Sequence, residues 1–251
     1  MKKRKIFIGT SGWMYKHWGE RFYPKDLKKE FLDFYAKEFK TVEINSSFYR
    51  MPSAKTFLQW KKQTPNNFVF AVKLNHYITH QKRLVLDEKS ESFLIAFLQN
   101  AQELEKKFST ILIQLPPSFK RNDLRLENFL KFYLQEMKKL KFRPLSSVEF
   151  RHDSWHDEEV YKILRKYKIA LVITSAPEIT SETFTANFVY IRMHGNEQHS
   201  SEYKNKELIE LKKRIENYPE KIKTIFIYFN NDYSAYAIEN ARFLISLFDK
   251  S

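Results

Sequence analysis

Short apolar runs alternate along this chain with longer segments in which apolar residues recur at helical spacing. The run 69–74 is rich in β-branched and aromatic residues, which favours a strand, whereas Phe93, Phe97 and Ala101 recur every four residues, as on one face of a helix. Eight runs of the first kind predict strands at 6–9, 41–45, 69–74, 111–115, 147–151, 169–174, 188–193 and 224–229. The helical spacing predicts helices over 25–38, 54–63, 90–107, 123–139, 157–167, 203–217 and 235–248.

The regular alternation of these segments, without a linker or low-complexity break, predicts one α/β domain over residues 1–251. Eight strand and helix units favour a (β/α)8 TIM barrel, in which eight parallel strands are enclosed by outer helices, over an open doubly wound sheet. The glycine-rich phosphate loops typical of such open sheets do not occur in the sequence. The connection 176–187 is short and contains Pro177 near its start, so we expect its helix to be short or irregular.

Polar side chains interrupt the predicted strands near their carboxyl ends, where TIM barrels carry their active sites. Because successive side chains of a strand point to opposite faces, these polar residues are expected to share the inward face. The inward set comprises Glu43, Asn45, Lys73, Gln114, Glu149, Arg151, Arg192, His194, Tyr228 and Asn230.

The charges of this set favour an anion. Lys73, Arg151 and Arg192 exceed the two glutamates, Glu43 and Glu149, by one positive charge. Barrels often hold phosphate at the loops after strands seven and eight, which correspond here to 192–195 and 230–232. The alternative is a purely structural network of ion pairs, because buried charges are costly unless they are paired.

All seven histidines and all four glycines lie in four stretches, 9–19, 76–80, 152–156 and 194–199, each of which follows a strand-like run. Histidine titrates near neutral pH, so these stretches mark a candidate catalytic region. The candidate proton carriers are Glu43, Glu149, His80, His152 and His194. Further substrate contacts are expected from loop residues, namely Trp13, Tyr49, Trp155 and Asn231.

Two other kinds of chemistry are compatible with some of the same residue types. Glu43 and Glu149 would suit a glycosidase if they faced each other across a cleft. The four-residue spacing of His76 and His80, and of His152 and His156, is compatible with a metal site. The glutamate of the zinc-binding HExxH motif is missing from both pairs, however. We therefore expect neither a metal nor another cofactor.

Composition narrows the class of protein. The net charge of +14, from 32 lysines and 12 arginines, makes nucleic acid an alternative partner, although the lysine pairs are spread along the predicted helices as on solvated faces. The chain has no cysteine, which excludes disulfides and thiolate catalysis. Neither a signal-peptide core nor a membrane-spanning run is present in the sequence, so we expect a cytoplasmic protein without membrane contact.

Ordered motifs extend over nearly the entire chain: 8–13 (IGTSGW), 41–45 (TVEIN) with Phe48 to Arg50, 78–80 (ITH), 114–117 (QLPP), 149–152 (EFRH), 192–195 (RMHG) and 228–232 (YFNND). In these motifs the chain resembles the YecE-like family, domain of unknown function seventy-two. The resemblance implies a TIM barrel and adds Arg50 to the substrate contacts, but it implies no established reaction. A likeness of the family's barrel to endonuclease IV has been the basis for suggesting nucleic-acid interaction.

The chain departs from the family pattern at two places. It has His76 and Tyr77 where the family tends to have arginine, and Tyr233 to Ala235 where a glycine is expected. Together these observations favour a metal-independent enzyme, a hydrolase or lyase, that acts on a small phosphorylated or otherwise anionic substrate. The alternatives are a non-catalytic nucleic-acid-binding protein and a glycoside-active enzyme that uses the two glutamates.

Overall fold

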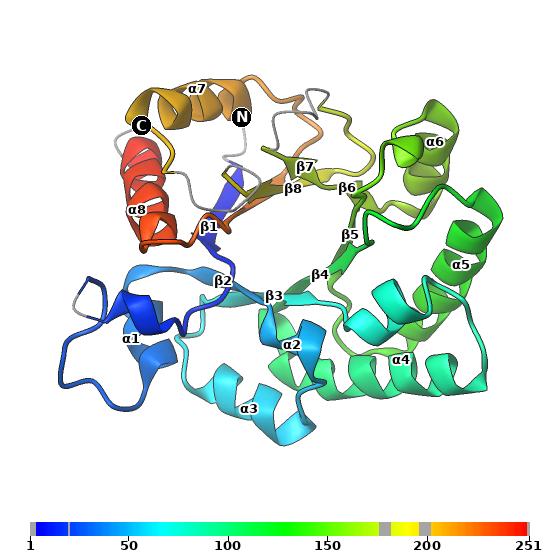
Figure 1. The fold of residues 1–251 in the computed structure, drawn as a ribbon, viewed down its shortest axis with the longest axis horizontal. Helices are drawn as coiled ribbons and strands as arrows, with labels where there is room; N and C mark the ends of the chain where they lie inside the picture. The colour runs from blue at the N-terminus through cyan, green and yellow to red at the C-terminus, as the bar shows by residue number, and fades with distance from the viewer. Residues whose placement is uncertain (1–3, 20, 176–181, 196–201, 250–251) are drawn as a thin grey trace.

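A computed structural model describes residues 4–19, 21–175, 182–195 and 202–249. Its strands run through the middle of the molecule and its helices surround them (Figure 1). The strands are β1 (Lys5–Thr10), β2 (Thr41–Ile44), β3 (Val69–Lys73), β4 (Phe108–Gln114), β5 (Leu145–Glu149), β6 (Ala170–Leu171), β7 (Ile173–Thr174), β8 (Phe188–Met193) and β9 (Thr224–Phe229). Each predicted strand therefore has a counterpart, and the sixth is divided into β6 and β7.

The strands form two parallel sheets, so the prediction of one closed eight-stranded barrel is wrong. The four-stranded sheet has the order β1-β9-β8-β7 and the five-stranded sheet the order β2-β3-β4-β5-β6. The first break falls at Val172, because β6 pairs with β5 whereas β7 pairs with β8. At the second break, the one β-bridge between the β1 and β2 segments in the described residues is the isolated pair of Ser11 and Glu43. Apolar periodicity marks where strands occur but contains no information on such changes of hydrogen-bonding partner.

The α-helices are α1 (Phe31–Glu38), α2 (Ser46–Tyr49), α3 (Ala54–Lys62), α4 (Glu88–Ala101), α5 (Asp123–Lys139), α6 (Glu158–Tyr167), α7 (Asn205–Glu216) and α8 (Tyr236–Asp249). Shorter helical turns are η1 (Lys16–Trp18), η2 (Tyr77–Gln81), η3 (Gln102–Lys107) and η4 (Asp153–Trp155), of which η2 is a π-helix. None of the helices in the described ranges has the length and apolar character needed to cross a bilayer.

Two predicted helices differ in extent. The segment 25–38 becomes helical only at Phe31, because Glu30 has a left-handed φ of 62°. The segment 90–107 is an α-helix to Ala101 and then a tighter helix interrupted at Glu105, whose φ is 51°. Of the connection 176–187, residues 182–187 contain no helix, and 176–181 lie outside the described residues.

An inner cluster of buried side chains connects the two sheets, with Ala71 and Leu112 from one and Tyr190, Phe226 and Tyr228 from the other. A larger cluster packs the strands against the helices. The close approach of β1 to β2 depends on Gly9, since a Cβ there would lie 2.2 Å from the carbonyl oxygen of Thr41. The polar residues described next lie at the carboxyl ends of the strands.

Candidate functional site

Arg192 on β8 binds two glutamates of the other sheet. Its Nη2 lies 2.7 Å from Glu43 Oε1, its Nε donates to Glu43 Oε2 at 2.9 Å, and its Nη1 donates to Glu149 Oε2 at 2.9 Å. All three side chains are at most 1% exposed. The guanidinium therefore joins the four-stranded sheet to the five-stranded sheet through charge-assisted hydrogen bonds.

Other side chains also donate hydrogen bonds to the two carboxylates. Tyr190 and Ser11 donate their hydroxyls to Glu43 at 2.6 and 2.7 Å, and Gln114 donates its amide to Glu149 at 2.9 Å. Burial opposes ionisation of both glutamates, but the charge of Arg192 outweighs it together with the other donors, so the pKa of each lies below its ordinary value. Both are therefore carboxylates at neutral pH.

Arg151 and His194 extend this network toward solvent. Arg151 Nε lies 2.6 Å from Glu149 Oε1, and its side chain is 29% exposed. His194 Nε2 lies 3.2 Å from the same oxygen, and Asn230 donates its amide to His194 Nδ1 at 3.2 Å. Burial, assisted by the charges of the two arginines, lowers the pKa of His194 to about 4 despite Glu149. His194 is therefore neutral, and its Nε2 lies 3.3 Å from Arg151 Nη2 and 3.4 Å from Arg192 Nη1 as well as beside Glu149.

Lys73 ends β3 beside this network, and it differs from the other cations of the site. Its Nζ lies 4.1 Å from the centre of the Phe48 ring, and no carboxylate of the described residues is within ion-pair distance. The residue is 9% exposed. Burial, followed by the charge of Arg192, lowers the pKa of Lys73 to about 8, although Glu43 and Glu149 act in the opposite direction.

The π-helix η2 places His80 next to the same aromatic ring. The His80 ring stands edge-on to Phe48 at 4.8 Å, and Thr79 Oγ1 lies 2.9 Å from His80 Nδ1. Burial and then the charge of Lys73 lower the pKa of His80 to about 4. A neutral imidazole and an amine thus lie against one phenyl group, and π-helical turns often occur at functional positions.

Several predicted site residues take part in packing instead. Trp155 is fully buried, stacks on Phe150 at 4.7 Å and donates its indole N–H to the Phe119 carbonyl at 2.6 Å. Asn231 donates to Asn240 of α8 at 2.9 Å. The Tyr228 hydroxyl lies 2.7 Å from Thr41 Oγ1, and Trp13 meets Trp60 edge-on at 5.3 Å.

The remaining predicted residues lie around η4 and α2. His152 caps η4, where its Nδ1 accepts from the Ser154 amide at 3.1 Å. Tyr49, at the end of α2, is 74% exposed, and the next residue, Arg50, is exposed as well. Asn45 precedes α2, and its buried Oδ1 has no hydrogen-bond partner within the described part of the chain.

Sequence reasoning missed a side chain that contacts the buried carboxylates. Tyr190 is two residues before Arg192 and thus on the same face of β8, so strand alternation could have identified it. In the predicted loop 230–232 the sequence did not indicate one interaction, in which Asp232 accepts from His17 Nε2 at 2.8 Å and from Trp18 Nε1 at 2.8 Å. Burial raises the pKa of Asp232. No spacing in the sequence connects these residues, which come from opposite ends of the chain.

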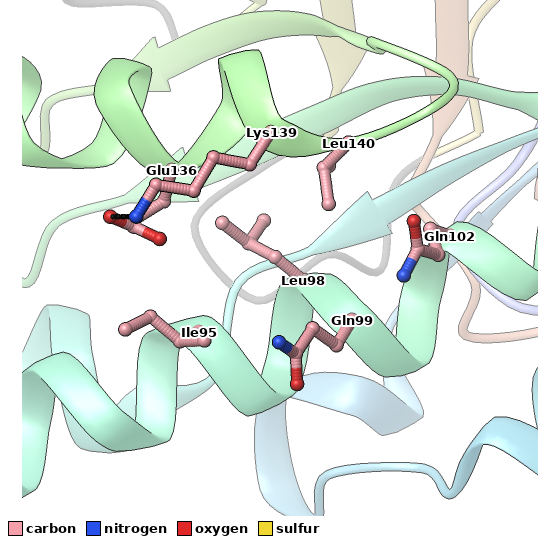
Figure 2. A pocket seen from close by; sticks show the side chains of 7 residues that line it. All are labelled: Ile95, Leu98, Gln99, Gln102, Glu136, Lys139 and Leu140. Atoms are coloured by element: carbon pink, nitrogen blue, oxygen red, sulfur yellow. Dashed lines mark hydrogen bonds and ion pairs between the residues drawn. The ribbon is translucent and has the colours of Figure 1, made fainter.

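The described residues contain no group of three histidine, aspartate or glutamate side chains arranged to hold a metal. A separate cavity of about 110 Å³ lies between α4 and α5, lined by Ile95, Leu98, Gln99, Gln102, Glu136, Lys139 and Leu140. Its two charged residues, Glu136 and Lys139, pair with each other at 2.6 Å (Figure 2). The two charged side chains that line this cavity therefore neutralise each other.

Comparison with known proteins identifies relatives over the whole chain. A family model described as protein of unknown function DUF72 matches residues 7–251. UPF0759 protein YunF of Bacillus subtilis is 25% identical over 280 residues, which cover 97% of this chain and 95% of YunF. UPF0759 protein YecE of Escherichia coli is 29% identical over 119 residues, 47% of this chain and 40% of YecE. The crystal structure of a DUF72 family protein of Thermotoga maritima, TM1631, has a TM-score of 0.81 and 28% identity, and the match covers 98% of this chain and 99% of that one. These matches confirm the resemblance indicated by the motifs.

Proposed function

Because this chain belongs to the DUF72 family, whose description names no reaction, we propose a function from the site itself: a metal-independent enzyme acting on a small phosphorylated or otherwise anionic substrate at the carboxyl ends of the strands. The observation that supports this proposal most directly is the unbalanced charge of Lys73. The Phe48 ring is the partner of its ammonium group, and none of the described residues places a carboxylate within ion-pair distance.

The charge count at the site favours an anionic ligand. Glu43 and Glu149 are both engaged by Arg192, and Arg151 also contacts Glu149. With His194 neutral, three cations face two carboxylates, which leaves one excess positive charge. Phosphate or carboxylate would offset this excess, and the partly exposed guanidinium of Arg151 is suited to bind either one.

We assign the proton-transfer step to His80. Its imidazole is neutral at physiological pH and packs against the Phe48 ring, which the Lys73 ammonium also contacts. The other candidates are less suited, since Glu43 and Glu149 are fully buried with their oxygens hydrogen-bonded, and His194 is occupied by Glu149 and Asn230. Those three residues hold Arg192 and Arg151 in position.

The same geometry argues against a glycosidase that uses the two glutamates. A glycosidase needs a sugar, and in inverting enzymes also a water, between its two carboxyl groups. Here the guanidinium of Arg192 bonds to both carboxylates. A mechanism of that kind would require this ion pair to break.

Binding of simple anions tests the proposal directly. We expect inorganic phosphate and sugar phosphates to raise the melting temperature of the wild type by several degrees at saturating concentration, because a ligand that binds only the native state stabilises it. Neutral sugars are expected to leave it unchanged. Isothermal titration calorimetry gives the affinity for the same ligands.

Two variants make the test specific. Arg151→Gln should weaken phosphate binding by about tenfold or more, since a charge-assisted contact contributes roughly 1.5–3 kcal/mol. Arg165→Gln is the matched control, because Arg165 is an exposed arginine whose one ion-pair partner among the described residues is the exposed Glu158 on α6. Equal affinity in both variants, or no shift with any phosphate-bearing ligand, would overturn the proposal.

A further inference from the structure

Two buried lysines of this chain have opposite environments. Lys107 is 8% exposed, and its Nζ donates to the carbonyls of Lys61 and Thr64 at 2.7 Å and to Thr64 Oγ1 at 3.0 Å. All three of its N–H groups therefore have acceptors. Lys73 is buried to a similar degree, but the partner of its Nζ is the face of Phe48. An amine held without acceptors keeps its lone pair available once it loses a proton.

The groups around Lys73 favour that loss. Arg192 and Arg151 repel the ammonium, Glu43 and Glu149 attract it, and burial adds the largest effect, so that its pKa falls to about 8. His80 and His76, which also face the Phe48 ring, contribute no anionic partner. Near pH 7.5 the neutral fraction of Lys73 is therefore roughly two hundred times that of a lysine with the ordinary pKa. A desolvated lysine beside other cations is the usual form of an activated amine nucleophile.

We propose that the Lys73 amine is a nucleophile that forms an imine with the carbonyl carbon of an anionic oxo compound bound next to Arg151. This inference rests on the anionic substrate of the proposed function and names its reactive group. The anionic end would contact Arg151, and the carbonyl would lie over Phe48 between Lys73 and His80.

The reaction balances with the groups at hand. The Lys73 nitrogen attacks the carbonyl carbon, a C–N bond forms, and the carbonyl π electrons move to oxygen. His80 transfers one proton from the attacking nitrogen to that oxygen. A second proton, equal to the one that the Lys73 ammonium released to solvent before the attack, is taken up again from solvent, and the oxygen leaves as water when the C=N bond forms. The product is an iminium ion, so the positive charge of Lys73 is retained, and the Phe48 face and the substrate anion continue to stabilise it.

Reductive trapping tests this inference on the full chain. The protein is incubated at pH 7.5 with pyruvate and sodium cyanoborohydride, which converts an imine into a stable secondary amine, and the modified lysine is located by peptide mass spectrometry. We expect Lys73 to be labelled at least tenfold faster than exposed lysines, because those are almost entirely protonated, and Lys107 to be unlabelled. Labelling that is spread over exposed lysines with Lys73 unmodified would overturn the inference.

A second variant and a second reagent separate this inference from the anion site. Lys73→Arg keeps the charge but has no nucleophilic amine, so it should keep the phosphate-dependent rise in melting temperature and lose the label at position 73. With acetaldehyde in place of pyruvate, selective labelling of Lys73 without any stabilisation by phosphate would support the nucleophile and overturn the anion site. Stabilisation by phosphate without selective labelling of Lys73 by either reagent would support the anion site and overturn the nucleophile.

Discussion

Arg192 combines two roles, because it neutralises two buried carboxylates and bonds one sheet to the other. Glu43 and Glu149 have no exposed surface, so removal of the guanidinium leaves Glu43 without its ion-pair partner in the interior and leaves Glu149 paired with Arg151. Breaking a buried ion pair by removing one partner typically costs about 3–5 kcal/mol. We expect Arg192→Met to lower the free energy of unfolding by at least this amount in urea titrations. Arg165→Met, which removes only an exposed pair, should cost about 1 kcal/mol or less, and a similar loss in both variants would contradict this account.

The two buried lysines should respond oppositely to the same substitution. Lys73→Met removes a buried ammonium that has no ion-pair partner among the described residues, so we expect about 1–2 kcal/mol of added stability at pH 7. Lys107→Met removes the donor of three acceptors, so we expect a loss of about 2–3 kcal/mol. Chemical denaturation of both variants provides the comparison. If Lys73→Met were as destabilising as Lys107→Met, the lysine of the site would be a structural residue.

His194 makes stability depend on pH in a defined window. Its pKa is about 4 in the folded protein and ordinarily 6.5, so between these values the unfolded chain binds a proton that the folded chain does not. Stability from this residue is therefore complete above about pH 6.5 and decreases as the pH falls toward 4. Between pH 7 and 5 the wild type should lose about 2 kcal/mol more than His194→Gln, measured by urea unfolding at both values. An equal loss in the two proteins would show that His194 is protonated in the folded state.

Among the elements, α6 ends with a residue that glycine would replace favourably. Lys168, its C-cap, is exposed and has a left-handed φ of 57°. Glycine adopts this conformation without a steric cost from Cβ. Lys168→Gly should raise the free energy of unfolding by about 0.5–1 kcal/mol, whereas Lys168→Ala, which keeps the Cβ, should give no gain. Thermal unfolding of the two variants distinguishes relief of backbone strain from loss of the lysine side chain.

Element positions followed from periodicity, whereas the connections between elements did not. Alternation of side chains placed Glu43, Lys73 and Arg192 on the inward face, and the structure brings Glu43 and Arg192 into direct contact. Side-chain alternation could not show that one guanidinium bonds to both glutamates, because this contact depends on how far the side chains extend from one sheet to the other. The same holds for Trp155 and Asn231, which follow strands but turn into the core. The break at Val172 could not be predicted either. The residues on both sides of it are apolar, and this pattern does not indicate that the two sides pair with different strands.

For the molecule as a whole, the net charge of +14 predicts weak, salt-sensitive attraction to nucleic acid that is separate from the site. Exposed lysines occur on helices that lie apart in the fold, such as Lys138 on α5 and Lys213 on α7, so the basic residues are distributed over several elements (Figure 1). We expect a short DNA duplex to bind near 50 mM salt and to be released by about 200 mM, because such contacts act by releasing counterions.

The variants of the anion site decide whether this attraction is functional. Arg151→Gln removes one partly exposed charge out of an excess of +14, so it should leave the affinity for the duplex and its dependence on salt nearly unchanged. The same substitution should weaken phosphate binding by about tenfold or more, since that contact is local and charge-assisted. Fluorescence anisotropy with a labelled duplex, run beside calorimetry with phosphate, measures both. A duplex whose binding persists at 200 mM salt and falls with Arg151→Gln would instead make nucleic acid the ligand of the strand-end site, and the small-anion substrate would have to be abandoned.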